Sequence, residues 1–191
     1  MDKGSYGYMN NYKMKHGIAL LIYAVIIGVL IVVGKLNILG NVTVSSVLVV
    51  LAILMVLPAA KHFIATIIVI SYKSVAKSDI DYFDEITNDI NTGISIYDLT
   101  LSSEEKIYYT PYIYVNGSNL YCLYLNYDKA GLDDVKAYIY KILYNHGYDM
   151  NIIMCKSIES MNKALSEAMP CEDENEKVLN NLKELLLDYN V

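Results

Sequence analysis

The chain has 191 residues, a net charge of −6 and a hydrophobic content of 54%, enough for one medium domain or a smaller domain with membrane segments. An acidic chain without a Lys/Arg-rich cluster argues against a nucleic-acid partner, because affinity for phosphates depends on grouped cations. The three cysteines, Cys122, Cys155 and Cys171, are too few and too scattered for a disulfide framework or a zinc site. They fit a reducing compartment, and we expect neither a metal nor another cofactor.

The first apolar segment, GIALLIYAVIIGVLIVVG at residues 17–34, contains no charged residue. At a rise of about 1.5 Å per residue it spans about 27 Å, close to the roughly 30 Å hydrocarbon core of a bilayer. A cleaved signal peptide is the rival interpretation. The following residues lack a small-x-small cleavage pattern, however, and a second apolar segment comes at once. We therefore expect a transmembrane helix.

The second apolar segment covers residues 42–60 and also suits one crossing. Lys61 and His62 then interrupt the apolar run before another mainly apolar stretch, which is too short for a third span. We expect residues 61–77 to form a juxtamembrane helix at the interface, with Pro58 as a kink. The alternative is that this stretch extends the second span.

The lysines around the two spans predict their orientation. Three precede the first span, namely Lys3, Lys13 and Lys15. Three follow the second span, namely Lys61, Lys73 and Lys77, and only Lys35 lies in the connection. We expect a multi-pass protein of the cell membrane, and the positive-inside rule predicts the orientation of its two spans. Its two termini would be cytoplasmic, with residues 1–16 as an N-terminal tail and residues 35–41 as a short external turn. Ala24 and Gly28 form a small-xxx-small pair that suggests a helix contact, although small residues are common in such helices.

Residues 78–191 show the pattern of a folded cytoplasmic domain, with α/β or α+β organisation. A helix after Ser78 has one apolar stripe, formed by Ile80, Phe83, Thr87 and Ile90, and Gly93 ends it. The later elements are predicted in the order strand, two strands forming a hairpin, helix, strand, helix, helix. Their segments are residues 94–101, the hairpin around Asn116-Gly117, and residues 132–147, 150–155, 157–169 and 174–189.

The predicted hairpin, residues 107–128, holds seven tyrosines. Asn-Gly between alternating runs is a strong hairpin signal, and a turn at Asn116-Gly117 would place Val115 opposite Ser118. One face would then carry four of the tyrosines and the other face two: Tyr108, Tyr112, Tyr114 and Tyr121, against Tyr109 and Tyr124. We interpret them mainly as sheet packing, because few cations lie nearby. The alternative is that the four-tyrosine face binds a protein partner.

The predicted order from Ser78 to Cys155, helix-strand-strand-strand-helix-strand, resembles the core of the restriction-endonuclease-like nucleases. The resemblance implies an acid on the second strand and Glu-x-Lys on the third. The third strand reads NLYCLYLNYD, with neither Glu nor Lys within it. If the fold is shared, the usual metal-dependent cleavage chemistry is not.

Other groups that could carry chemistry favour structural roles. Asp81, Asp84 and Glu85 would share one side of a helix, where they could bind a hard cation, but they also suit a solvated helix face. His16, His62 and His146 have no Cys or carboxylate partner at ligand or triad spacing. No glycine-rich phosphate loop is present. The sequence therefore predicts no catalytic residue and no metal ligand.

These observations favour an integral membrane protein in the lipid bilayer, with a cytoplasmic interaction or regulatory domain that is not an enzyme. A first alternative is a membrane-tethered hydrolase or nuclease-like enzyme with divergent ligands. It predicts that carboxylates from separate elements, such as Asp84, Asp98 and Asp128, converge in one cleft. A second alternative is a small accessory subunit of a larger membrane complex.

Overall fold

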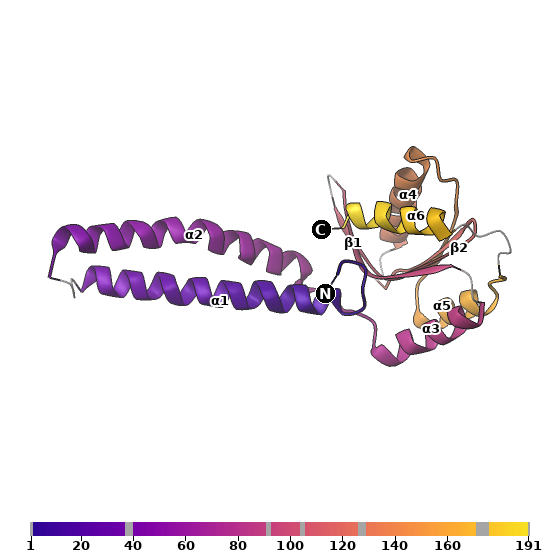
Figure 1. Cartoon of the computed structure of the whole chain (residues 1–191), viewed down its shortest axis with the longest axis horizontal. Helices are drawn as coiled ribbons and strands as arrows, with labels where there is room; N and C mark the ends of the chain where they lie inside the picture. The colour runs from indigo at the N-terminus through magenta and orange to yellow at the C-terminus, as the bar shows by residue number, and fades with distance from the viewer. Residues whose placement is uncertain are drawn as a thin grey trace. The chain divides into compact units, whose positions relative to one another are not determined.

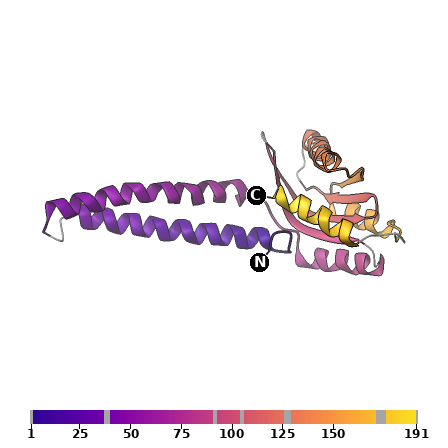
Figure 2. The same cartoon turned by 45° about the horizontal axis from the view of Figure 1, so that its top comes forward.

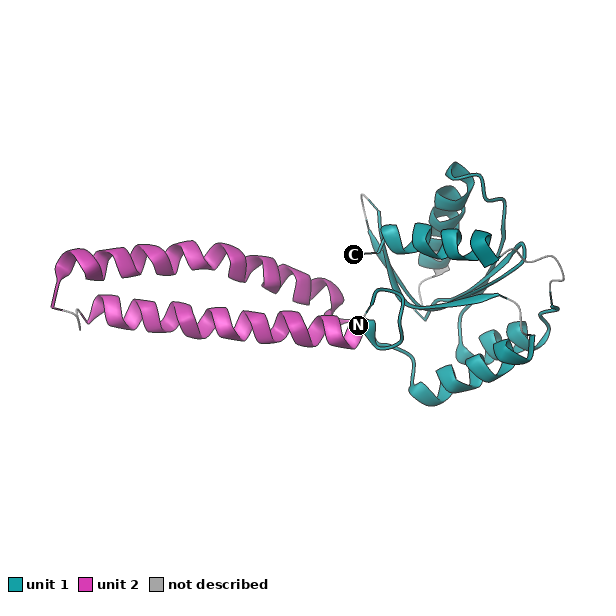
Figure 3. Ribbon diagram, viewed as in Figure 1, with its two compact units in different colours: residues 1–8, 73–191 teal, residues 9–72 magenta. Residues whose placement is uncertain are grey.

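The computed structural model describes residues 2–36, 40–90, 93–103, 106–125, 129–170 and 176–190. These residues form helices and one four-stranded mixed sheet, which confirms the mixed helix–sheet class (Figure 1). The chain divides into two compact units. One contains residues 9–72, and the other combines residues 1–8 with residues 73–191 (Figure 3).

The first unit is a pair of long helices, α1 (Tyr8–Lys35) and α2 (Val42–Ile70). The predicted spans lie inside them, and residues 61–70 continue α2 without a break, so that Pro58 is inside one helix. Asn41 caps α2, because its side-chain oxygen accepts from the backbone N–H of Thr43 at 3.0 Å. At the other end, the Lys13 ammonium donates to the carbonyl oxygens of Ile70 and Tyr72, where a helix dipole favours a cation.

Both helices are long and apolar enough to cross a membrane. Their apolar side chains face outward: only 6% of the most apolar window of α1 and 11% of that of α2 are buried. A core helix of a water-soluble protein would be mostly buried. The helices approach closely at Gly34, where an added Cβ would meet Val49 Cγ2 at 2.8 Å and the Ser45 carbonyl oxygen at 3.0 Å.

The second unit is built on four strands: β1 (Ile94–Ser102), β2 (Ile107–Asn116), β3 (Asn119–Leu123) and β4 (Asn151–Cys155). The sheet order is β1-β2-β3-β4. The first three strands form an antiparallel meander, whereas β4 is parallel to β3. The helix α4 (Lys129–Asn145) makes the connection that two parallel neighbours require.

Helices cover both faces of this sheet, as strands with apolar residues on both sides require (Figures 1 and 2). On one face, α4 and α6 (Glu176–Asp188) pack over Ile113, Leu120 and Ile152. On the other face, α3 (Lys77–Ile90) and α5 (Ile158–Ser166) cover Tyr112, Leu123 and other buried residues. The unit is therefore a three-layer helix–sheet–helix sandwich.

The alternation of side chains breaks once in β1 and once in β2, at positions that lie opposite each other. Tyr97 pairs with Tyr112 and Leu99 with Thr110, whereas Asp98 and Pro111 are not among the paired residues. Pro111 has no N–H to donate to the ladder, and Asp98 adopts a left-handed φ of 49°. One residue on each strand is thus skipped, so that the register is kept while the faces exchange.

Because of this exchange, the faces predicted for the two tyrosines that precede Pro111, Tyr108 and Tyr109, are not the observed ones. Tyr108 packs on the α4 side, with its ring centroid 5.6 Å from that of Tyr138 in α4. Tyr109 was expected beside Tyr124, yet its hydroxyl instead reaches Asp98, which also bonds Ser74 just before α3. The prediction that Tyr108 shares a face with Tyr112 was wrong, because simple alternation cannot pass a skipped residue.

The hairpin turn also lies one residue later than expected. Asn116 pairs with Asn119 and Val115 with Leu120, which leaves Gly117 and Ser118 as the central residues. Gly117 has a φ of 57°, and a II′ turn places glycine at this first central position. The hairpin prediction holds, but its register shifts by two residues on β3. An even shift leaves each side chain of β3 on its predicted face.

Candidate functional site

The tyrosines proposed as a partner surface do not form one exposed patch. Tyr112, Tyr114 and Tyr121 are 0%, 1% and 6% exposed, and they pack beneath the domain's own helices α3 and α5. Phe83 of α3 lies over Tyr112 with ring centroids 4.9 Å apart. Their burial leaves the partner hypothesis without an accessible surface at these three positions, while Tyr108 lies on the opposite face.

The small residues proposed as a helix contact, Ala24 and Gly28, lie at surface positions of α1. Both are exposed, and an added Cβ at Gly28 would meet no described atom within 4 Å. Gly34, which the sequence analysis did not single out, makes the close contact with α2 instead. The sequence feature that could have identified Gly34 is its position beside the connection, where two antiparallel helices must converge.

The acids of the enzyme hypothesis do not gather into a metal site in the described part of the chain. No cluster of three or more His, Cys, Asp or Glu residues occurs there. Asp84 accepts from the Tyr97 hydroxyl at 2.6 Å, Asp81 and Glu85 are exposed on α3, and Asp98 lies in β1. Asp128 falls outside the described residues, so its position relative to the other two stays a prediction.

The sheet face toward α3 instead contains two acid–tyrosine pairs. Asp98, 1% exposed, accepts from the Tyr109 hydroxyl at 2.6 Å and from Ser74 Oγ at 3.0 Å. Burial, together with the charge of Asp98, raises the pKa of Tyr109. Burial and the hydrogen bond to Asp84 likewise raise the pKa of Tyr97. Both phenols therefore remain protonated donors at neutral pH, which suits a structural network better than proton transfer.

The two described cysteines are unreactive by the same reasoning. Cys122 is fully buried, and burial raises the pKa of its thiol. Burial also raises the pKa of Cys155, which outweighs the opposing hydrogen bond to Ser160. A nucleophilic cysteine needs a lowered pKa and access, so these two residues act as small core side chains.

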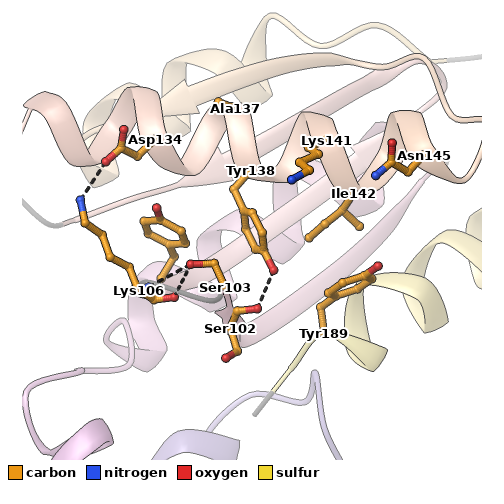
Figure 4. A pocket seen from close by; sticks show the side chains of 11 residues that line it. Ser102, Ser103, Lys106, Asp134, Ala137, Tyr138, Lys141, Ile142, Asn145 and Tyr189 are labelled. Carbon is orange, nitrogen blue, oxygen red and sulfur yellow. Dashed lines mark hydrogen bonds and ion pairs between the residues drawn. The ribbon is translucent and has the colours of Figure 1, made fainter.

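A cavity lies between α4 and the connected end of the β1–β2 hairpin, and we call it the α4 cleft (Figure 4). Its volume is about 590 Å³, within the range of small-molecule and side-chain sites. The hairpin contributes Ser102, Ser103, Lys106 and Tyr108, α4 contributes Asp134, Ala137, Tyr138, Lys141, Ile142 and Asn145, and Tyr189 follows α6. None of these residues except Tyr108 was a predicted site residue.

The walls of the α4 cleft are held in place by their own hydrogen bonds (Figure 4). The Lys106 ammonium pairs with the Asp134 carboxylate at 2.9 Å, and the Tyr138 hydroxyl donates to the Ser102 carbonyl oxygen at 2.5 Å. Lys141, by contrast, makes no ion pair within the described residues. Among its described residues, the cleft thus offers a positively charged group, Lys141, beside the Asn145 amide.

A second feature that the sequence analysis missed is a histidine pair in the helical unit. The Nδ1 atoms of His16 and His62 are 2.9 Å apart, and the rings of Tyr12 and Tyr23 lie beside them. The two histidines are equally far in sequence from residue 39, in the connection between the helices. In an antiparallel helix pair such residues reach the same depth, which was the available signal.

Comparison with protein-family models, curated proteins and solved structures found no match to this chain. The structure itself therefore defines the class: a three-layer mixed helix–sheet domain on a chain with two outward-facing apolar helices.

Proposed function

We propose that this chain is an integral membrane protein that displays a cytoplasmic binding domain. Helices α1 and α2 cross the bilayer as a hairpin, both termini lie in the cytoplasm, and the sandwich domain recruits or senses a partner there. The domain acts as a regulatory or interaction module and not as an enzyme.

The observation that supports membrane insertion is the outward orientation of the apolar side chains on α1 and α2. Val29, Leu54 and Leu57 are 55%, 56% and 72% exposed. In water this surface would far exceed the few hundred Å² of a typical exposed apolar patch, whereas in a bilayer it contacts lipid tails. Most of the lysines lie at the ends of the two spans that are away from their connection, and this excess supports cytoplasmic termini.

The observation that supports a binding role is the α4 cleft. Lys141 and Asn145 present donors on one wall, and the aromatic rings of Tyr108 and Tyr138 form apolar surface beside them. Such a mixture suits the side chain of an acidic residue in a partner protein, because the charge can meet Lys141 while its stem packs on tyrosine. The partner class that we propose is therefore a protein with an exposed acidic segment.

The test is quantitative co-purification of the full chain from membranes, read by mass spectrometry. We expect Lys141→Glu to lose the partner, because it turns the attraction into repulsion. Lys163→Glu is the matched control, since Lys163 is an exposed lysine of α5, outside the cleft. Equal recovery with both variants would contradict binding at the cleft. Turnover of a nucleotide, nucleic acid or peptide by the purified chain would contradict the non-enzymatic role.

A further inference from the structure

The two edges of the domain's sheet differ in how their backbone groups are paired. At the β1 edge, the Tyr97 N–H donates to the Gly4 carbonyl oxygen at 3.0 Å. The Thr100 N–H donates to the Asn190 side-chain oxygen at 3.0 Å, and the Ser102 N–H donates to the Tyr189 carbonyl oxygen at 3.2 Å. The two ends of the chain thus cover this edge.

The β4 edge has no such cover in the described residues. The Asn151 N–H donates to Ser118, and the Cys155 carbonyl oxygen accepts from Tyr124, so residues 151, 153 and 155 direct their backbone groups toward β3. In a strand, the intervening residues direct their backbone N–H and C=O groups toward the opposite edge. The N–H and C=O groups of Ile152 and Met154 therefore face outward, and no described backbone group bonds to them.

We propose that β4 pairs with β4 of a second copy of this chain. The two strands are antiparallel, and a two-fold axis passes between the two Ile153 residues. Ile152 of each copy then exchanges both backbone hydrogen bonds with Met154 of the other, and the two sheets become one. This arrangement uses all the outward groups of Ile152 and Met154, and it is self-complementary, as a two-fold interface must be.

Charge supports the antiparallel direction. Asp149 precedes β4 and Lys156 follows it, while the strand NIIMC itself has no charge and no proline to discourage pairing. Antiparallel pairing about Ile153 places Lys156 of one copy opposite Met150 of the other, one residue from Asp149, at both ends of the interface. A parallel partner strand of the same sequence would bring like charges together instead.

Shape supports a second copy as well. A groove of about 350 Å³ runs between β4 and α4, and its walls include Ala137, Tyr140, Met150 and Ile152. Met154 lies on the same sheet face as Ile152, so Met154 of the second copy, directly opposite Ile152, projects along this groove. If the proposed membrane anchoring holds, confinement to one bilayer also raises the effective concentration of copies.

The test is disulfide trapping of the full chain in membranes, in a Cys171→Ser background. Opposed Ile153→Cys residues form a non-hydrogen-bonded pair with Cα atoms about 4.5 Å apart, within the range of about 4.4–6.8 Å that a disulfide spans. We expect mild oxidation to give a homodimer as the main species. Lys163→Cys, at an exposed position of α5, is the control and should remain monomeric.

Adding Met154→Pro provides the second test. Proline removes an N–H that faces outward and spares the pairing with β3, so the fold should persist, with its near-ultraviolet circular dichroism unchanged, while the Ile153→Cys dimer is lost. Three results would overturn the proposal: trapping no greater than in the control, a dimer that survives Met154→Pro, or trapping of a different protein. The last result would assign the edge to an extended partner segment. None of them affects the proposed membrane insertion, because the labelling test of that claim reads Leu36 and Lys163, which lie outside β4.

Discussion

The chain's two phenylalanines show how differently its two units use apolar residues. Phe83 of α3 is 0% exposed and packs on Tyr112, whereas Phe63 of α2 is 52% exposed. The domain turns its apolar side chains inward around a sheet, and the helical hairpin turns them outward. This contrast supports the proposal that lipid surrounds the hairpin and water surrounds the domain.

The largest effect should come from Phe83→Ala. Loss of a fully buried phenylalanine should lower the free energy of unfolding of the domain by about 3–5 kcal/mol, because transfer and cavity costs add. The measurement is thermal unfolding of the full chain in detergent, followed by the tyrosine near-ultraviolet circular dichroism. Phe63→Ala is the matched control and should leave the domain transition in place. A comparable loss with Phe63→Ala would break the contrast between the two units.

A charge on the outward face of the hairpin should be nearly as costly. Val29→Lys places an ammonium near the middle of the first span, which costs about 2.5–3.5 kcal/mol on insertion scales. We expect less protein in the carbonate-resistant membrane fraction. Tyr144→Lys, at a 62% exposed position of the domain, should leave that fraction unchanged. Equal fractions for both variants would contradict lipid contact at Val29.

A smaller effect should distinguish two glycines of α1. Gly34→Leu drives a side chain into Val49 and Ser45 of α2 and should destabilise the hairpin by about 1–3 kcal/mol through overpacking. Gly28→Leu faces open space and should be tolerated. Thermal loss of helical circular dichroism in detergent compares them. If Gly28→Leu alone also released a co-purifying membrane protein, the exposed pair with Ala24 would be a contact with another subunit.

The smallest effect concerns the acid–tyrosine pairs. Their raised pKa values mean that above about pH 10 the unfolded chain releases tyrosine protons that the native domain retains, so stability falls as pH rises. Tyr97→Phe should cost about 1–2 kcal/mol at pH 7 and flatten this alkaline decline. Tyr108→Phe, in the α4 cleft, is the control. The melting temperature Tm measured from pH 8 to 11 would contradict the account if both variants declined as steeply as the native chain.

Local patterns predicted much of the architecture. The apolar runs located α1 and α2, and helical spacing placed Ile80, Phe83, Thr87 and Ile90 on the face of α3 that is buried. These features depend on neighbouring residues along one element, which is the information that a sequence displays.

What the sequence did not predict depends on contacts between distant segments. The skipped pair Asp98 and Pro111 involves two strands that must distort together, and alternation in one strand cannot reveal it. The α4 cleft joins a hairpin end, a helix and Tyr189, which no motif connects. The cover over β1 likewise brings Gly4 and Asn190, near opposite ends of the chain, to one strand.

The central claim is that α1 and α2 cross the bilayer with the domain on the cytoplasmic side, and cysteine labelling tests it most directly. In intact cells and a Cys171→Ser background, an impermeant maleimide should label Leu36→Cys, at the end of α1. It should label Lys163→Cys, in the domain, only after permeabilisation. Labelling of Lys163→Cys in intact cells, or protection of Leu36→Cys until permeabilisation, would contradict the account.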